Sequence, residues 1–179
     1  MTVPALTDDT VVLDAFTDAD VDAHLAGEDE ELARRFGWHP DRSSPTSVAA
    51  TIQRWRREWA DGGATRAFAV RRIDDDVLIG GVELRLGPER VAELSYWIFP
   101  AARGEGYAGR AIRLVSEFAF GTLEVERVEA FIEPDNIGSL GAAQRIGFVP
   151  EGLLRGRGLF GDERRDMVIL GLLSTDLRD

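Results

Sequence analysis

The fold of this 179-residue chain is decided by the stretch Trp97-Ile98-Phe99-Pro100-Ala101-Ala102-Arg103-Gly104-Glu105-Gly106-Tyr107-Ala108-Gly109-Arg110. An apolar run ends here, a glycine-rich turn follows, and apolar residues then recur at helical spacing from Ala108 to Ala119. Glycine lets a backbone approach an anion closely, and the first turn of a helix presents N–H groups without a partner in the helix. The stretch therefore predicts a strand, a loop and a helix that can hold a phosphate group.

The same glycines also fit a different pattern. Gly104, Gly106 and Gly109 satisfy the G-x-G-x-x-G spacing of dinucleotide-binding folds, in which the first glycine follows its strand almost at once. Here residues 100–103 intervene, and only one further helix is predicted downstream. An acidic residue at about the expected distance, Glu129 or Glu133, keeps the dinucleotide interpretation open, as does a turn that merely joins two elements.

Composition narrows the functional classes. The formal net charge of −11 argues against nucleic-acid binding, and all 21 basic residues are arginine. The chain has no cysteine, so disulfides, thiolate metal sites and a thioester on the enzyme are excluded. No run of apolar residues approaches the length of a membrane span, and the N-terminus has no signal-like segment. We expect one domain over residues 1–179 that is cytoplasmic and binds no membrane and no metal.

Apolar periodicity predicts an antiparallel series of strands with helices before and after it. Ser47 is predicted to cap a helix that ends at Gly62 and carries an apolar stripe. Asp74 to Asp76 is predicted to be a solvated turn. The predicted strands cover residues 11–13, 68–70, 77–86, 91–99, 127–133, 148–154 and 166–173, and the stripe consists of Val48, Ile52, Trp55 and Trp59.

Two further segments complete the prediction. A helix from Asn136 to Gly147 should turn Ile137, Leu140 and Ile146 inward, and residues 157–165 should be a polar connection between the last two strands. Residues 36–40 form an aromatic loop, whose Trp38 either lines a substrate site or packs into the core.

Several of these motifs resemble the GNAT superfamily of N-acetyltransferases, and within it the RimJ/RimL-like branch that acetylates protein N-termini. The signature R-x-x-G-x-A is met by Arg103, Gly106 and Ala108. The N-x-x-S turn that opens the next helix is met by Asn136 and Ser139. The branch's fourth strand and the exit of that helix are matched by residues 93–98, 145–148 and 151–152. The resemblance covers most of the chain in the right order.

The resemblance implies an α+β fold, with a splayed, mostly antiparallel mixed sheet flanked by helices. Acetyl-CoA, as the acyl donor, would lie where the sheet opens after its fourth strand. Pantetheine would follow the strand end, and pyrophosphate would bind the loop amides, with charge added by Arg103 and Arg110. The cofactor-binding residues implied are Trp97, Ile98, Phe99, Arg103, Gly104, Gly106, Tyr107, Ala108, Gly109, Arg110, Asn136 and Ser139.

Catalysis needs a group that accepts a proton, since an amine is largely protonated at neutral pH. Glu93 is the first candidate base and Glu83 the second; either could also be an ordinary exposed strand carboxylate, and hairpin register decides between them. Ser139 could help to release the CoA thiolate. Many superfamily members use a tyrosine for this step, but Tyr96 and Tyr107 both precede the Asn136 turn, so Ser139 or water is expected to serve.

The sequence thus predicts an N-acetyltransferase that transfers acetyl directly to a primary amine in a ternary complex. The acceptor would be a protein N-terminus or a small molecule, and residues 30–46 and 155–165 would touch it. An acetyltransferase for an amine-bearing antibiotic or a polyamine, and an inactive CoA-binding regulatory module, remain alternatives. The sequence is also compatible with a homodimer.

Overall fold

A computed structural model describes residues 2–37, 41 and 43–178 of the chain, and its strands form one eight-stranded sheet in the order β1-β2-β3-β4-β5-β6-β8-β7. Neighbouring strands are antiparallel except β5 and β6, which are parallel. The strands are β1 (Leu6–Thr7), β2 (Val11–Asp14), β3 (Thr65–Arg72), β4 (Leu78–Leu86), β5 (Val91–Ile98), β6 (Arg127–Ile132), β7 (Val149–Phe160) and β8 (Glu163–Leu173). The predicted α+β class and its mostly antiparallel mixed sheet are confirmed.

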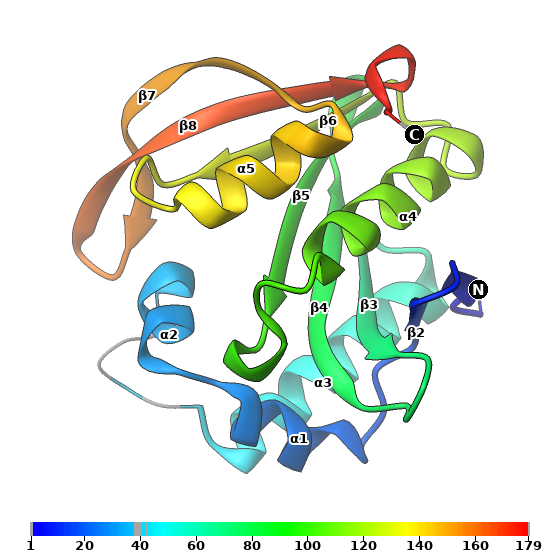
Figure 1. Cartoon of the computed structure of the whole chain (residues 1–179). Coiled ribbons are helices and arrows are strands. Elements are labelled where there is room, and N and C mark those ends of the chain that lie inside the picture. The colour runs from blue at the N-terminus through cyan, green and yellow to red at the C-terminus, as the bar shows by residue number, and fades with distance from the viewer. Residues whose placement is uncertain (1, 38–40, 42, 179) are drawn as a thin grey trace.

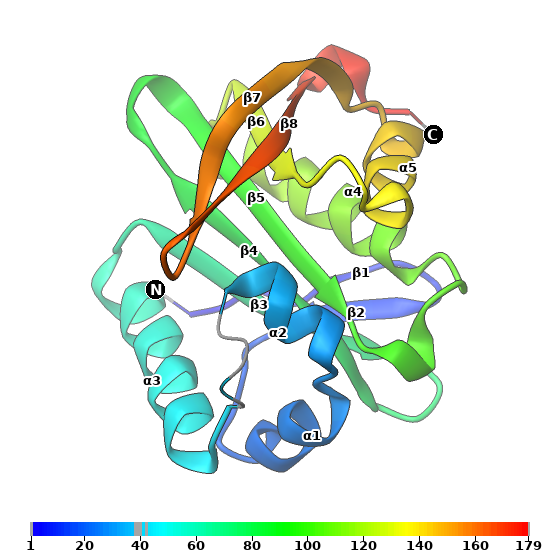
Figure 2. The same ribbon diagram turned by 90° about the vertical axis from the view of Figure 1, so that its left-hand side faces the viewer.

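Helices cover both faces of this sheet (Figures 1 and 2). On one face lie α1 (Asp20–Gly27), α2 (Glu30–Phe36) and α3 (Pro45–Asp61). On the other lie α4 (Tyr107–Gly121) and α5 (Ile137–Ile146). Three short 3₁₀ turns, Pro88–Arg90, Pro100–Ala102 and Ser174–Asp176, join or follow strands. Each face buries its own apolar cluster; that under α4 and α5 includes Ile112 and Leu170, and that under α1 to α3 includes Ile52 and Trp55.

The sheet opens between its two parallel strands. The pairing of β5 with β6 covers only Val91 to Glu93 on β5, and it ends where Glu93 lies beside Glu129. Beyond that pair the two strands diverge, and the space between them faces the N-terminal ends of α4 and α5 (Figure 1). The divergence follows the strand that was predicted as the fourth, because the two-residue β1 was not predicted. The remainder of β5, from Leu94 to Ile98, therefore borders the opening.

The structure corrects three local predictions. Ser44, rather than Ser47, is the N-cap of α3, because Pro45 occupies the first helical turn and Ser47 completes a reciprocal capping box. Ile137 was expected to point inward but is 71% exposed in the first turn of α5. Residues 157–165 are not a polar connection, since β7 and β8 run through them to a turn at residues 161–162.

The predictions for the apolar stripe of α3 and for the acidic turn hold. The apolar stripe of α3 is buried, with Trp55 and Trp59 only 7% and 2% exposed. Residues 74–76 lie in a turn between β3 and β4. Trp38 lies outside the described residues. Within the described ranges there is no helix long and apolar enough to cross a membrane, and no cluster of three or more side chains that could hold a metal ion.

Candidate functional site

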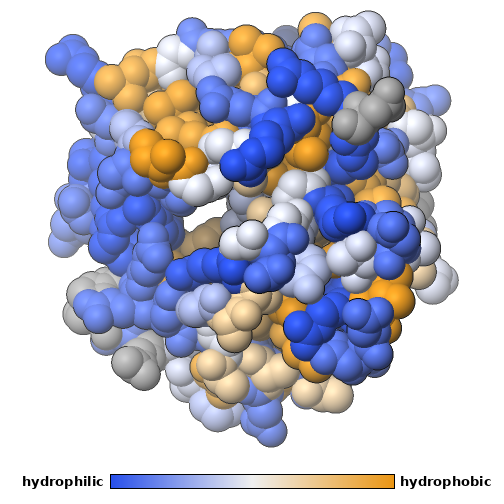
Figure 3. All heavy atoms as spheres, in the orientation of Figure 1, coloured by the Kyte–Doolittle hydropathy of each residue, from blue (hydrophilic) through white to orange (hydrophobic). Residues whose placement is uncertain are grey.

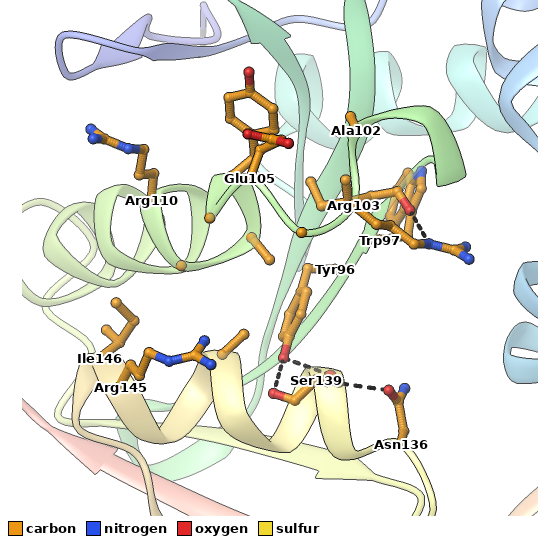
Figure 4. A pocket seen from close by; sticks show the side chains of 18 of the residues that line it. Tyr96, Trp97, Ala102, Arg103, Glu105, Arg110, Asn136, Ser139, Arg145 and Ile146 are labelled. Carbon is orange, nitrogen blue, oxygen red and sulfur yellow. Dashed lines mark hydrogen bonds between the residues drawn. The ribbon is translucent and has the colours of Figure 1, made fainter.

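A pocket of about 1230 Å³ occupies the opening of the sheet. Its walls are the end of β5, the loop of residues 102–106, the N-terminal half of α4, one side of α5 along its length, and the inner side of α2. The space-filling view shows an opening that passes through the molecule (Figure 3), and the close-up shows side chains that line the pocket (Figure 4). The pocket thus joins the glycine loop to α2, which lies on the opposite face of the sheet from α4.

The glycine loop leaves room for a ligand against its backbone. Gly104 and Gly106 adopt φ angles of +89° and +83°, which L side chains rarely adopt, and a Cβ on either would meet no heavy atom of the described residues within 4 Å. Gly106 is the N-cap of α4 and has no side chain that could bond the N–H groups of Tyr107, Ala108 and Gly109. Unpartnered helix N–H groups, the helix dipole and open space together form an anion site, so these residues fit a diphosphate.

Several arginines line the pocket, but they differ in their partners. Arg110 Nη1 lies 2.8 Å from carboxylate oxygens of both Asp8 and Asp9. Burial by itself would raise the pKa of Asp8, but hydrogen bonds from the Val11 N–H and Arg110 outweigh it and the pKa is lowered. Arg103 is paired as well, with residues of α2. By contrast, Arg113 and Arg145 form no ion pair within the described part of the chain. These two arginines therefore have free donors for an anionic ligand.

The first turn of α5 meets β5 through a pair of hydroxyl groups. The Tyr96 phenol lies 2.6 Å from Ser139 Oγ and donates to the Ser139 carbonyl at 2.9 Å (Figure 4). The Asn136 side chain caps α5 by accepting from the Ser139 N–H at 3.2 Å. Burial raises the pKa of Tyr96 to about 12, although the bond to Ser139 opposes it. The phenol is therefore protonated at neutral pH and able to donate.

The end of the pocket under α2 is aromatic. Trp97 packs edge-on against Phe36 of α2, with ring centroids 5.8 Å apart, and lies nearly parallel to Trp55 of α3 at 5.9 Å. His24 of α1 contacts both Trp97 and Phe99. Among the described residues, His24 Nδ1 and Trp97 Nε1 are buried without a hydrogen-bond partner. This end is mainly apolar, although the charged side chains of Glu31, Arg35 and Asp135 also line the pocket.

The register of β4 and β5 places both candidate bases on this aromatic face. Cross-strand pairs join Gly81 to Trp97, Glu83 to Ser95 and Arg85 to Glu93. Glu83 is 8% exposed, and its two oxygens accept from Trp55 Nε1 at 2.7 Å and Arg85 Nη2 at 2.8 Å. Glu93 is more exposed and lies 3.3 Å from Arg85 Nη1. Neither carboxylate lines the pocket, so either could reach an amine there only through water or a shift of the acceptor.

Most of the predicted cofactor residues do border the pocket. Phe99 is the exception, because its ring is 4% exposed and packs on the α1 side. The predicted residues that line it are Trp97, Ile98, Arg103, Gly104, Gly106, Tyr107, Ala108, Gly109, Arg110, Asn136 and Ser139. The Tyr96–Ser139 pair was not predicted from the sequence, because a tyrosine was expected only after Asn136. The period-two pattern of β5 put Tyr96 on the face opposite Trp97, and that was the signal available.

Comparison with known proteins identifies the domain. The sequence model of the "Acetyltransferase (GNAT) domain" family matches residues 10–149. The chain is 33% identical to "Probable N-acetyltransferase YjcK" of Bacillus subtilis over 112 aligned residues. The alignment covers 61% of this chain and 62% of that protein. It is 31% identical over 136 residues to "Putative ribosomal N-acetyltransferase YdaF" of the same organism, 75% of this chain and 73% of that one.

A solved structure shares the fold. Mycobacterium smegmatis RimJ in complex with CoA-disulfide superimposes with a TM-score of 0.82 at 22% identity, covering 100% of this chain and 90% of that one. At that identity the likeness concerns the fold alone.

Proposed function

The chain belongs to the acetyltransferase (GNAT) family and is an acetyltransferase, and from this premise we propose that it transfers acetyl from acetyl-CoA directly to a primary amine in a ternary complex. The observation that carries the proposal is the open glycine loop at the N-terminus of α4, beside the unpaired end of β5. We propose that residues 1–179 form one such domain and that it acts without a metal. Its cytoplasmic location is a prediction from the sequence.

The residues of the pocket suit acetyl-CoA bound in one direction. The N–H groups of residues 104–109 would hold the pyrophosphate, and the unpaired arginines Arg113 and Arg145 would attract further phosphate charge. The pantetheine would extend along β5 toward Trp97 and Ser139, since that strand end lacks a neighbour on its β6 side. Acetyl-CoA supplies the activated thioester, and its acetyl group would then lie between the hydroxyl pair and the aromatic end.

For the base, the geometry favours Glu83 over Glu93. Strand residues two apart are separated by about 6.8 Å, so the Glu83–Ser95 pair is roughly that far from the Gly81–Trp97 pair, and Glu93 is about twice as far. Glu83 is also buried beside Trp55 on the aromatic face. We therefore assign Glu83 to accept the amine's proton through a water molecule. Glu93 would act as a positioning residue, holding Arg85 against Glu83.

For the leaving group, Tyr96 and Ser139 supply hydroxyl groups at the end of the pantetheine path. A phenol with a pKa of about 12 is too weak an acid to give its proton completely to a thiolate of pKa about 8.5. It can stabilise the departing thiolate by hydrogen bonding. The attacking nitrogen loses a proton as it becomes the amide nitrogen. The hydroxyl groups of Tyr96 and Ser139 would pass this proton to the departing sulfur, which leaves as the thiol. The sequence predicted that Ser139 or water helps to release the thiolate, and this proposal adds Tyr96 to Ser139 in that role.

A relative and the net charge of the chain bear on the class of acceptor. The similarity to YdaF favours a protein N-terminus, as in the RimJ/RimL-like branch. A small amine, such as a polyamine or an amine-bearing antibiotic, is the second candidate, and the acidic net charge of −11 favours a cationic acceptor of either kind.

Two matched variants test the assignment of the base. Glu83→Gln should lower kcat by about two to four orders of magnitude, whereas Glu93→Gln should cost less than tenfold. Both should bind CoA as the wild type does. Thiol release from acetyl-CoA across peptides, polyamines and aminoglycosides supplies the acceptor and the assay. Full activity of Glu83→Gln together with loss in Glu93→Gln would reverse the assignment, and no acetyl transfer with intact CoA binding would favour a regulatory module.

A further inference from the structure

Arg103 stands at the start of the glycine loop, but its side chain leaves the loop and reaches α2. Arg103 Nη1 and Nη2 bond the two carboxylate oxygens of Asp29 at 2.8 and 3.1 Å, and Nη1 also lies 3.1 Å from Glu31. Its Nε donates to the Ile98 carbonyl at 3.0 Å. In Figure 4 the guanidinium points away from Arg110 and Arg145. Every nitrogen of this guanidinium therefore has a partner outside the loop.

The partner of Arg103 is the residue that starts α2. Asp29 is the N-cap of this helix and accepts from the Leu32 N–H at 2.8 Å with the same carboxylate that Arg103 holds. Burial would raise the pKa of Asp29, but the bonds from Arg103 and Leu32 lower it, so the carboxylate is charged at neutral pH. The two-pronged pairing fixes direction as well as distance, because guanidinium and carboxylate are both planar.

The other end of α2 is tied to the turn before α5. Arg35 Nη1 lies 2.6 Å from both Glu133 and Asp135, and Arg165 of β8 donates to the Arg34 carbonyl at 2.7 Å. Figure 2 shows α2 lying across the sheet beside the hairpin of β7 and β8. This seven-residue helix is thus held at its first turn by the glycine loop and at its last turn by the residues that precede Asn136.

From these contacts we infer that Arg103 is a positioning residue for the acceptor side of the pocket, and that its side chain does not bind the pyrophosphate. This inference rests on the proposed function, because it treats α2 as a wall of the acceptor end. Leu32, Arg35 and Phe36 of α2 line that end. The loop amides hold the donor while the Arg103 side chain fixes the wall, so one loop sets the spacing between the two substrates.

Binding of the donor does not require Arg103 to move. The pyrophosphate site consists of N–H groups with open space at Gly104 and Gly106, and Arg113 and Arg145 are available for charge. Moving Arg103 onto a phosphate would break its bonds to Asp29, Glu31 and Ile98 and leave the cap of α2 without its cation. The arrangement of lower free energy keeps Arg103 bonded to α2 in both the free and the donor-bound protein.

The test combines amide hydrogen exchange with kinetics. Arg103→Met removes the guanidinium and keeps the side-chain length, and Asp29→Asn removes the charge but keeps a good N-cap residue. Peptides covering residues 30–36 should exchange at least threefold faster in both variants, and the double variant should add nothing further, because both single changes remove one interaction. Arg113→Met, which removes an arginine from another wall of the pocket, should leave exchange in these peptides unchanged.

In solution, CoA should bind Arg103→Met within threefold of the wild-type Kd, while the KM for the acceptor rises about three- to tenfold and kcat changes less than twofold. Unchanged exchange in residues 30–36, or a CoA affinity more than threefold weaker, would overturn the inference and make Arg103 a phosphate ligand or a surface residue. Failure of the wild type to bind CoA would refute the proposed function instead. The comparison of hydrogen exchange in the ligand-free protein would still test whether Arg103 holds α2 in place.

Discussion

Replacing Gly106 with alanine tests whether the glycine loop binds the donor. Gly106 has φ +83° and ψ 0°, and holding an L residue in that left-handed conformation costs about 1–2 kcal/mol. For a domain of this size each kcal/mol lowers Tm by about 2–4 °C, so Gly106→Ala should melt about 2–8 °C lower. The added methyl group meets no heavy atom within 4 Å, so the variant should fold.

The same methyl group would occupy the space from which a pyrophosphate approaches the loop. We expect Gly106→Ala to bind CoA at least tenfold more weakly, which corresponds to about 1.4 kcal/mol. Isothermal titration calorimetry gives the affinity, and the rise in Tm on adding CoA gives an independent check by mass action. NAD and NADP should not raise the Tm of the wild type.

Gly62→Ala is the matched control. Gly62 ends α3 with φ +68°, a Cβ there also meets nothing within 4 Å, and the residue does not line the pocket. It should lose a similar amount of stability and keep the wild-type affinity for CoA. If Gly106→Ala bound CoA as tightly as Gly62→Ala does, or if NAD and not CoA stabilised the wild type, the reasoning about the loop would be refuted.

Two further predictions follow from side chains around the pocket. Tyr96→Phe removes the phenol that contacts Ser139 and should lower kcat about ten- to a hundredfold with little change in CoA affinity, measured by thiol release; an unchanged kcat would exclude the phenol from the reaction. Burial lowers the pKa of His24 below its ordinary value of 6.5, so the unfolded chain takes up this proton first as pH falls. The contribution of neutral His24 to stability should therefore be complete above pH 6.5 and decline below it. Between pH 7.5 and 5.0, urea titrations should show a smaller loss in the free energy of unfolding for His24→Phe than for the wild type. Equal losses in the two proteins would contradict a lowered pKa for His24.

Local features of the sequence were enough to predict the glycine loop and the helices that begin beside the pocket. The glycines at 104 and 106 were identified because only residues without a Cβ suit a loop that backs onto an anion, and the structure gives both a positive φ. The helix after them was identified from its apolar spacing, and the turn that opens α5 from its match to the N-x-x-S pattern at Asn136 and Ser139. Each of these signals lies within a few residues, where backbone propensity and side-chain periodicity act directly.

Errors arose where an exposed strand or a helix end has no apolar pattern to mark it. The polar residues 157–165 form the edge of the sheet, where β7 has a neighbour on one side only, so their alternation buries little and does not show in the sequence. Ile137 looked like a core residue by spacing, but it lies in the first turn of α5, beside the pocket rather than over the sheet.

The sequence by itself determined the family, the class of fold and the glycine loop, because each depends on the order and spacing of neighbouring residues. Only the tertiary structure decided which side chains meet across the pocket. Tyr96 reaches Ser139 across 43 positions and Arg103 reaches Asp29 across 74, contacts that depend on the opening of β5 from β6 and the placement of α2. The choice of Glu83 over Glu93 likewise needed the hairpin register, since a one-residue shift would place the two carboxylates on opposite faces of the sheet.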